Sequence, residues 1–239
     1  MSTAPTIEGV DDSTVRGGVA AEGPRSASGH AEASAGGAGP VRVAVILGSL
    51  REGRFGSTVA GWVAERLLSR GAERGDVAVD VLDVAEVPLG LDMAAPSAES
   101  APGAAGAAGA LADVAGRLAA ADAFVVITPE YNHSFPAALK NLIDWHFTEW
   151  QAKPVSFVSY GGLGGGLRAV EQLRGVFAEL HAVTIRRGVS FHHPWNWFDD
   201  AGRPAEAESN ERAMAGVIDQ LVWWATALRS ARGATPYEP

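Results

Sequence analysis

The segment Gly48–Thr58, GSLREGRFGST, has the residue types that bind a phosphate group. Its glycines permit tight turns, Ser49 and Ser57 offer hydroxyls, and Arg51 and Arg54 offer planar cations. A helical pattern begins near Ser57, so free N–H groups and the positive end of a helix dipole point into the segment. We interpret it as a phosphate cradle in preference to a solvated turn.

This cradle departs from two common nucleotide motifs. Arg54 stands where a Walker A loop has its lysine, and Phe55 replaces the hydroxyl that binds magnesium. The chain also lacks the G-x-G-x-x-G pattern that binds a dinucleotide pyrophosphate. A terminal phosphomonoester, which is a compact dianion, fits hydroxyls and arginines better.

A second polar segment, TPEYNHSFPAALKNLIDW, runs from Thr128 to Trp145, directly after the apolar run Ala123–Ile127. Pro129 stiffens the exit from the predicted strand, and Glu130–Asn132 present a row of backbone N–H and C=O groups. Such a row can bind the polar edge of a planar heterocycle, and Tyr131 adds a flat face.

Two other interpretations of this segment are open. It can be an ordinary strand-to-helix turn with Tyr131 partly in the core. Alternatively, Glu130 and His133 can form an acid–base pair for hydrolysis, although no nucleophile with an orienting third group accompanies them.

A third loop, SYGGLGGG at Ser159–Gly166, follows the apolar segment Pro154–Tyr160. Its glycines let the backbone approach a flat ligand closely. Such a run is also typical of a flexible connection between a strand and a helix. It supports a ligand site only because it is the third unusual loop predicted at the same edge of the sheet.

Five strand patterns alternate with five helical patterns. The strands are predicted at Val41–Leu47, Val77–Val84, Ala123–Thr128, Pro154–Tyr160 and Val183–Phe191, and the helices at Ser57–Arg70, Ala110–Ala121, Pro136–His146 (capped by Ser134), Leu167–Leu180 and Ser209–Ser230. This alternation predicts an α/β fold with three layers, a doubly wound parallel five-stranded sheet of order 2-1-3-4-5. Ligands of such sheets bind at the carboxyl ends of the strands, where all three loops lie.

The chain has 239 residues, of which residues 1–39 contain eight glycines and no aromatic side chain. We expect a disordered tail at 1–39, one domain at 40–232 with a mobile Ala/Gly-rich loop at 85–109, and a short tail at 233–239.

Composition excludes several functions. The chain has no cysteine, which excludes disulfides and thiol catalysis and fits a cytoplasmic location. A net charge of −9 disfavours nucleic-acid binding, and no apolar run is long enough for a membrane span. His192 and His193 lack a third metal ligand at a sensible spacing, so we expect no metal site.

In this order and spacing, GSLREGRFGS, PEYNHSFPAALKNLIDW and SYGGLGGG resemble the flavodoxin-like NADPH-dependent FMN reductase family, which includes quinone, azo-dye and chromate reductases. The likeness covers about residues 41 to 192, and PEYN-x-S-x-P-x-x-L-K-N is its most specific segment.

The resemblance implies an FMN site and a set of residues for it. Its phosphate is expected at Ser49, Arg51 and Ser57 with help from Arg54, its isoalloxazine and ribityl groups at Pro129, Glu130, Tyr131 and Asn132, and its pyrimidine end at Ser159, Gly161 and Gly162. The family also implies a homodimer, which in some members pairs into a tetramer.

The function implied is ping-pong hydride transfer from NADPH, or NADH, through FMN to a flavin, a quinone or a similar small acceptor. No side chain need act as a catalytic acid or base. A flavin-binding electron carrier or sensor is the alternative, although the two arginines disfavour it, and a nucleotide-binding regulatory domain is a third interpretation. Trp195 and Trp197 can roof the flavin or seal a dimer.

Overall fold

The computed structural model describes residues 39–87, 89–90, 104–199, 202–204 and 207–239. Residues 1–38 are a separate unit and are not among them. Almost all of the tail predicted at 1–39, and residues 88 and 91–103 of the loop predicted at 85–109, therefore lie outside the described residues.

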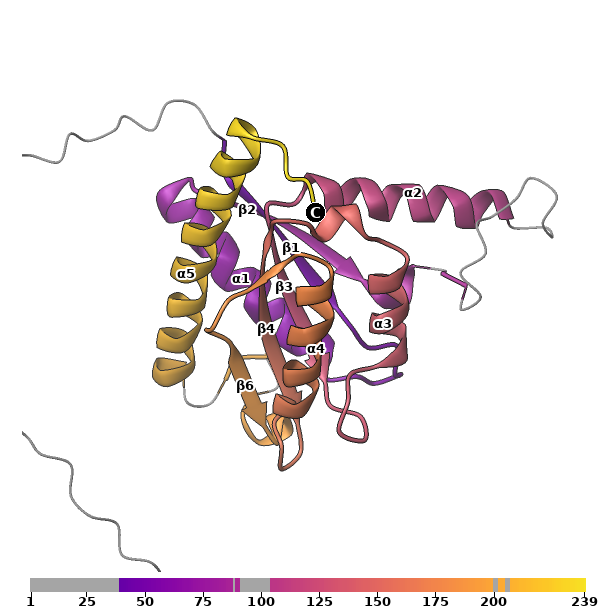
Figure 1. The fold of residues 1–239 in the computed structure, drawn as a ribbon. Helices are drawn as coiled ribbons and strands as arrows, with labels where there is room; N and C mark the ends of the chain where they lie inside the picture. The colour runs from indigo at the N-terminus through magenta and orange to yellow at the C-terminus, as the bar shows by residue number, and fades with distance from the viewer. Residues whose placement is uncertain (1–38, 88, 91–103, 200–201, 205–206) are drawn as a thin grey trace, which may run out of the picture. The chain divides into compact units, whose positions relative to one another are not determined.

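A parallel sheet forms the centre of the unit that begins at Gly39 (Figure 1). Its strands are β1 (Val41–Leu47), β2 (Val77–Asp83), β3 (Ala123–Pro129), β4 (Pro154–Gly161), β5 (Val183–Thr184) and β6 (Val189–His192). The order is β2-β1-β3-β4-β5, and β6 also pairs with β4. The predicted order 2-1-3-4-5 is confirmed, and the carboxyl ends of all paired strands lie at one edge because every pairing is parallel.

Helices cover both faces of this sheet (Figure 1). They are α1 (Gly56–Arg74), α2 (Ala104–Ala120), α3 (Ala137–Asp144), α4 (Leu167–Glu179) and α5 (Ala207–Ala234). Alternate residues of β1 face opposite layers: Val43 and Val45 pack with α1 and α5, whereas Ala44 and Ile46 pack with α2, α3 and α4. This two-sided burial explains why β1 is apolar from Val43 to Leu47 instead of alternating, while Arg42 near its start is exposed.

The predicted fifth strand is interrupted in the structure. β5 pairs with Pro154 and Val155, and β6 pairs with Val158–Gly161, so two short strands share the fifth position and a sixth strand is added. Between them, Ser156 Oγ donates to the carbonyl of Arg187 at 3.0 Å. This buried hydroxyl bonds the backbone that a continuous strand would have used in its ladder.

Two local predictions were wrong. Helix α2 begins at Ala104, so residues 104–109 are helical and not part of a loop. Ser134 does not cap α3, whose N-cap is Pro136 without a side-chain hydrogen bond. The Ser134 hydroxyl instead donates to Gln172 Oε1 on α4 at 2.6 Å.

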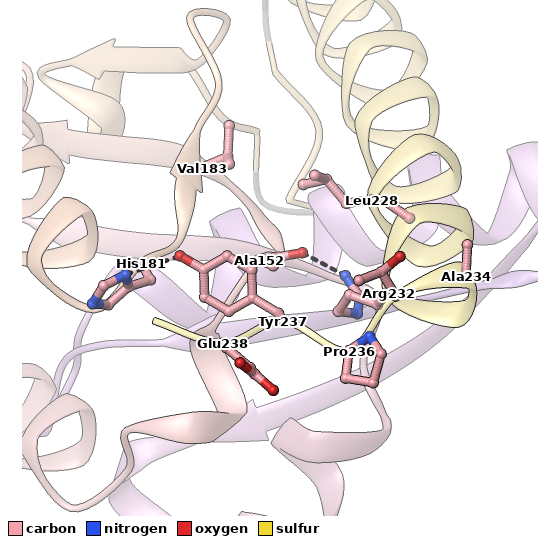
Figure 2. A pocket seen from close by; sticks show the side chains of 11 residues that line it. Ala152, His181, Val183, Leu228, Arg232, Ala234, Pro236, Tyr237 and Glu238 are labelled. Atoms are coloured by element: carbon pink, nitrogen blue, oxygen red, sulfur yellow. Dashed lines mark hydrogen bonds between the residues drawn. The ribbon is translucent and has the colours of Figure 1, made fainter.

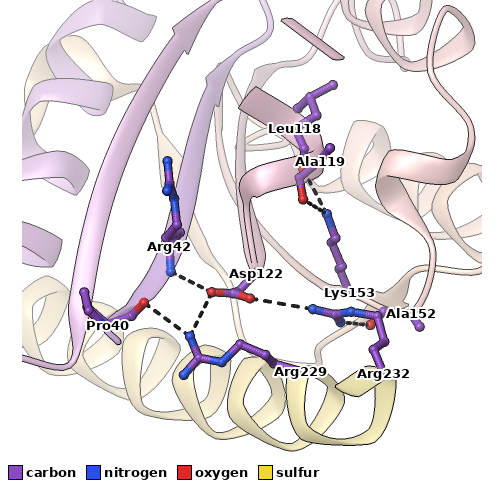
Figure 3. A network of polar contacts seen from close by, with 9 residues as sticks. All are labelled: Pro40, Arg42, Leu118, Ala119, Asp122, Ala152, Lys153, Arg229 and Arg232. Atoms are coloured by element: carbon purple, nitrogen blue, oxygen red, sulfur yellow. Dashed lines mark hydrogen bonds and ion pairs between the residues drawn. The ribbon is translucent and has the colours of Figure 1, made fainter. Parts of the chain in front are cut away.

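Charged side chains form a network of polar contacts at the amino-terminal edge of the sheet (Figure 3). Asp122, just before β3, accepts hydrogen bonds from the Arg42 amide at 3.0 Å and from Arg229 Nη1 at 3.1 Å. Arg232 Nη2 lies 3.6 Å from the other carboxylate oxygen. Both arginines come from α5, so Asp122 ties this helix to the start of the sheet.

Lys153 lies beside this network and is buried. Its Nζ donates to the carbonyls of Leu118 and Ala119 at 2.9 Å each, at the end of α2 (Figure 3). The last carbonyls of a helix lack partners within the helix, so Lys153 satisfies two of them.

A change of Lys153 to Met should alter the pH dependence of stability. Burial lowers the pKa of Lys153 to about 8, and Arg232 acts in the same direction, while Asp122 and Glu149 oppose it. The ordinary pKa of a lysine, which applies in the unfolded chain, is about 10.5. Between about pH 8 and pH 10.5 the unfolded chain therefore binds more protons at Lys153 than the folded chain does, so this group makes stability rise with pH.

Urea unfolding of the wild type and Lys153→Met at pH 7.5, 8.5 and 9.5 checks this. The stability of wild type relative to the variant should increase with pH, by at most about 1.4 kcal/mol per unit. A difference that stays constant over these pH values would show that Lys153 does not titrate there.

Among the helices that the structure describes, none has the length and apolar character needed to cross a bilayer.

Candidate functional site

Three loops meet around a cavity of about 400 Å³ at the carboxyl edge of the sheet. They are the β1–α1 loop (Gly48–Phe55), the β3–α3 loop (Glu130–Pro136) and the glycine loop (Gly162–Gly166) between β4 and α4. The lining residues are Arg51, Glu52, Gly53, Arg54, Phe55, Pro129, Glu130, Tyr131, Tyr160, Gly161, Gly162, Pro194 and Trp195. The last two follow β6 and add a fourth segment to the cavity wall.

The β1–α1 loop presents a helix start and two different arginines. Helix α1 begins at Gly56, and its N-cap residue Phe55 makes no side-chain hydrogen bond to the first turn. The Gly56 amide has the Tyr160 hydroxyl as its partner. Arg54 Nη1 donates to the carbonyl of Ser49 at 2.6 Å, and its Nη2 pairs with Asp83. Arg51 is exposed and its side chain makes no hydrogen bond or ion pair to any described residue. Arg54 therefore fixes the loop, and Arg51 offers a cation to a ligand.

Buried hydroxyls form the floor beneath this loop. Ser49 Oγ and the Tyr131 hydroxyl are hydrogen-bonded at 2.7 Å. Burial raises the pKa of Tyr160 above its usual range, and the neighbouring Tyr131 acts in the same direction, so Tyr160 stays a neutral phenol. A Cβ at Gly56 would lie 2.6 Å from the Tyr160 hydroxyl, which is why glycine opens this helix.

The β3–α3 loop contains a tight two-residue turn. The Tyr131 amide donates to the Ser134 carbonyl at 2.8 Å, and the Ser134 amide donates back at 3.0 Å. Asn132 and His133 between them have φ of 50° and 67°. Positive φ at both central positions is the geometry of a type I′ turn. Tyr131 is thereby held at the cavity wall.

The glycine loop is held from the side of β6. The carbonyl of Gly165 accepts hydrogen bonds from Ser159 Oγ at 2.8 Å and from Ser190 Oγ at 2.7 Å. His192 Nδ1 donates to the carbonyl of Leu163 at 3.0 Å. At Gly162 an added Cβ would meet no atom within 4 Å, so this residue faces open space where a flat ligand can approach.

The eleven residues predicted from the sequence fall into two groups. Seven line the cavity, namely Arg51, Arg54, Pro129, Glu130, Tyr131, Gly161 and Gly162. Ser49, Ser57, Asn132 and Ser159 belong to the same three segments but do not line it; Ser57 Oγ accepts from Arg54 Nε at 3.4 Å, and Ser49 and Ser159 hold loops as described above.

Several lining residues were not predicted as ligands. Phe55 and Tyr160 lie within predicted segments, while Pro194 and Trp195 follow the last strand at the same sheet edge. Trp195, for which a place over the flavin or in a dimer contact was left open from the sequence, lines the cavity and is 59% exposed. Trp197 does not line the cavity. His192 serves the glycine loop, and no cluster of metal-ligand type occurs among the residues that the structure describes.

The unit has a second, larger cavity of about 760 Å³ (Figure 2). It lies where β4 and β5 begin, between Ala152, Val183 and the end of α5, opposite the three loops. Three of its polar side chains already have partners within the protein, because the Tyr237 hydroxyl is 2.9 Å from His181 Nδ1 and Arg232 donates to the Ala152 carbonyl. The cavity at the carboxyl edge is therefore the stronger candidate.

Comparison with known proteins gives one family and several relatives. The family described as NADPH-dependent FMN reductase matches residues 41–196. An NAD(P)H-dependent FMN reductase of Schizosaccharomyces pombe is 36% identical over 125 residues, which are 52% of this chain and 60% of that protein. A quinone reductase of Escherichia coli is 32% identical over 152 residues, which are 62% of this chain and 74% of that protein.

A solved structure supports the fold. The flavoenzyme FerB of Paracoccus denitrificans, an NAD(P)H:(acceptor) oxidoreductase, superposes with a TM-score of 0.56 at 24% identity, over 78% of this chain and 98% of that one. This chain thus has the architecture of that flavoenzyme, while it spans only about three fifths of the S. pombe relative.

Proposed function

Because this chain belongs to the NADPH-dependent FMN reductase family, we propose that it is an NAD(P)H-dependent oxidoreductase that binds FMN in the cavity at the carboxyl edge of the sheet. The observation that carries this proposal is the convergence of three loops, predicted separately from the sequence, around that single cavity. The proposed acceptor is a flavin, a quinone or a similar small molecule, in keeping with the names of the relatives.

The residues present fit the phosphate of FMN. The N-cap residue of α1, Phe55, makes no side-chain hydrogen bond, and it lines the same cavity as Arg51, whose guanidinium has no partner among the described residues. A helix start with an adjacent arginine is a common anion site. We propose that the phosphate lies here, that Arg51 contacts it directly and that Arg54, paired with Asp83, shapes the loop.

The flat ring of FMN fits between the β3–α3 loop and the glycine loop. Pro129, Glu130 and Tyr131 form one wall, and Gly161 and Gly162 form another without side chains. We propose that the amides of Gly161 and Gly162 lie near the pyrimidine end of the ring, where N–H donors stabilise negative charge on a reduced flavin.

Bound FMN would supply the redox chemistry, by accepting a hydride from NAD(P)H and giving two electrons to the acceptor. The protein's share is to bind, orient and shield the ring. Trp195, which follows β6, lines the same cavity and is exposed. We propose a ping-pong order, in which the nicotinamide and the acceptor use the same exposed face of the ring and the oxidised nicotinamide leaves before the acceptor binds.

The experiment that tests this function is a steady-state assay of the purified chain with FMN. Oxidation of NADPH and of NADH is followed by absorbance with a benzoquinone acceptor at several fixed concentrations. Parallel lines in the double-reciprocal plots are expected for ping-pong order. FMN binding without turnover of either nicotinamide would contradict the enzyme and favour the electron carrier or sensor.

Other parts of the functional prediction remain proposals of the same kind. The expected homodimer or tetramer can be measured by light scattering, and Trp195 as an exposed aromatic residue suits either the acceptor or a subunit contact. The cytoplasmic location rests on the lack of cysteine.

A further inference from the structure

The turn in the β3–α3 loop contains a residue that does not suit its backbone. Type I′ turns favour Asn at the first central position and Gly at the second. Asn132 meets the first preference, but His133 occupies the second with φ of 67°. A side chain with a Cβ is disfavoured in this left-handed conformation, so contacts with neighbouring groups are needed to hold it.

Two side chains of α4 hold this turn. Arg168 Nη1 donates to His133 Nε2 at 2.8 Å, and Gln172 Nε2 donates to the His133 carbonyl at 2.8 Å. The same Gln172 amide accepts from Ser134 Oγ at 2.6 Å. Since Arg168 and Gln172 are one helical turn apart, they act on the turn from one face of α4.

Arg168 also neutralises the carboxylate of Glu130. Its Nη2 forms an ion pair with Glu130 Oε1, and its amide donates to Oε2 at 3.3 Å. The side chain of Glu130 is only 7% exposed. A carboxylate this buried needs a paired cation, so Glu130 depends on Arg168.

The Arg168–Glu130 pair also contacts the glycine loop. A Cβ on Gly164 would lie 2.4 Å from Arg168 Nη2 and 3.1 Å from Glu130 Oε2. The loop therefore packs its bare backbone against the ion pair. Arg168 itself does not line the cavity, so its influence on a ligand must pass through these neighbours.

We propose that Arg168 is a positioning residue of the cofactor site. It joins the β3–α3 loop to the glycine loop through Glu130 and keeps His133 in its left-handed conformation, so that Tyr131 stays at the cavity wall. This inference rests on the proposed function, because it assumes that FMN binds between those two loops. It also assigns Glu130 and His133 to loop geometry and not to acid–base catalysis.

The test compares FMN affinity, by quenching of flavin fluorescence, in four variants. Arg168→Met should weaken FMN about 10-fold or more, and Arg168→Lys should restore part of the loss. Adding His133→Gly to Arg168→Met should restore the part of the affinity lost through the turn, because glycine adopts positive φ without strain. Glu171→Gln, an exposed change on the same helix, should leave affinity within twofold of wild type.

Hydrogen exchange of the flavin-free protein gives a readout that does not depend on FMN. The amides of Tyr131 and Ser134, which bond each other's carbonyls, should exchange faster in Arg168→Met than in wild type. If Arg168→Met does not fold, Glu130→Gln with Arg168→Met removes the unpaired charge and takes its place in both measurements.

Three outcomes would overturn the inference. FMN affinity of Arg168→Met within twofold of wild type would show that Arg168 positions nothing the cofactor needs. A loss that His133→Gly fails to relieve, with unchanged exchange at Tyr131 and Ser134, would indicate direct contact with the ligand. If the amides of Tyr131 and Ser134 exchanged at the wild-type rate in Arg168→Met, the proposed role of Arg168 in holding the turn would be wrong. A wild type that does not bind FMN would instead refute the proposed function, while exchange would still report on the turn.

Discussion

Replacing Gly166 with alanine is expected to lower the free energy of unfolding by about 2–4 kcal/mol and to abolish measurable FMN binding. Gly166 has φ of 83°, a left-handed conformation that disfavours any side chain. An added Cβ would lie 2.7 Å from Ser159 Cβ and 2.9 Å from the Tyr160 amide nitrogen. Both atoms belong to the buried strand β4 and cannot move away, so the glycine loop must shift.

Urea unfolding and flavin fluorescence of Gly166→Ala check this expectation. Gly175→Ala is the matched control, because Gly175 is an exposed residue inside α4 whose Cβ would meet nothing within 4 Å. That variant should be more stable than wild type by about 0.5–1 kcal/mol. If Gly166→Ala were as stable as the wild type, the expectation would be wrong, because the glycine loop could then accommodate a Cβ at this position without cost.

Replacing Arg51 with alanine should weaken FMN about 10- to 150-fold and leave riboflavin affinity nearly unchanged. A hydrogen bond to a charged group contributes about 1.5–3 kcal/mol, which corresponds to this range. Riboflavin lacks the phosphate, so it should not register the loss of a phosphate ligand. The exposed side chain of Arg51 has no partner among the described residues, so its removal should leave the fold unchanged.

Titration of both flavins into wild type and Arg51→Ala measures the effect. Arg74→Ala at the far end of α1 changes the net charge equally and should not alter either affinity. Loss of less than threefold for FMN, or equal losses for FMN and riboflavin, would exclude Arg51 as a phosphate ligand. Arg54 is a poorer choice for this test because its ion pair with Asp83 shapes the loop.

Most elements of this fold could be predicted because each is encoded locally. The apolar strands and the helical spacing of buried residues such as Val59, Val63 and Leu67 are visible in the sequence. The break between β5 and β6 is not, because it involves tertiary contacts such as the hydrogen bond between Ser156 and Arg187, which are 31 residues apart. The start of α2 was missed since Ala/Gly repeats suit a loop as well as a helix.

The candidate site, too, could be predicted only in part from the sequence. The carboxyl-end rule located all three loops, because it depends only on strand order and direction. Which side chains of those loops face the cavity depends on tertiary contacts. Ser49 and Ser159 stay predicted ligands, and the structure adds that their hydroxyls are hydrogen-bonded to Tyr131 and Gly165, which the sequence does not indicate. Arg168 was not predicted at all, since its partners Glu130 and His133 lie 38 and 35 residues away.

The most direct test of the account is a fluorescence titration of FMN with the purified chain. The account predicts quenching that saturates at one FMN per chain, and weaker binding of riboflavin because the β1–α1 loop then has no phosphate to bind. FMN fluorescence that stays unchanged at a molar excess of protein would contradict the central claim that this cavity is a flavin site.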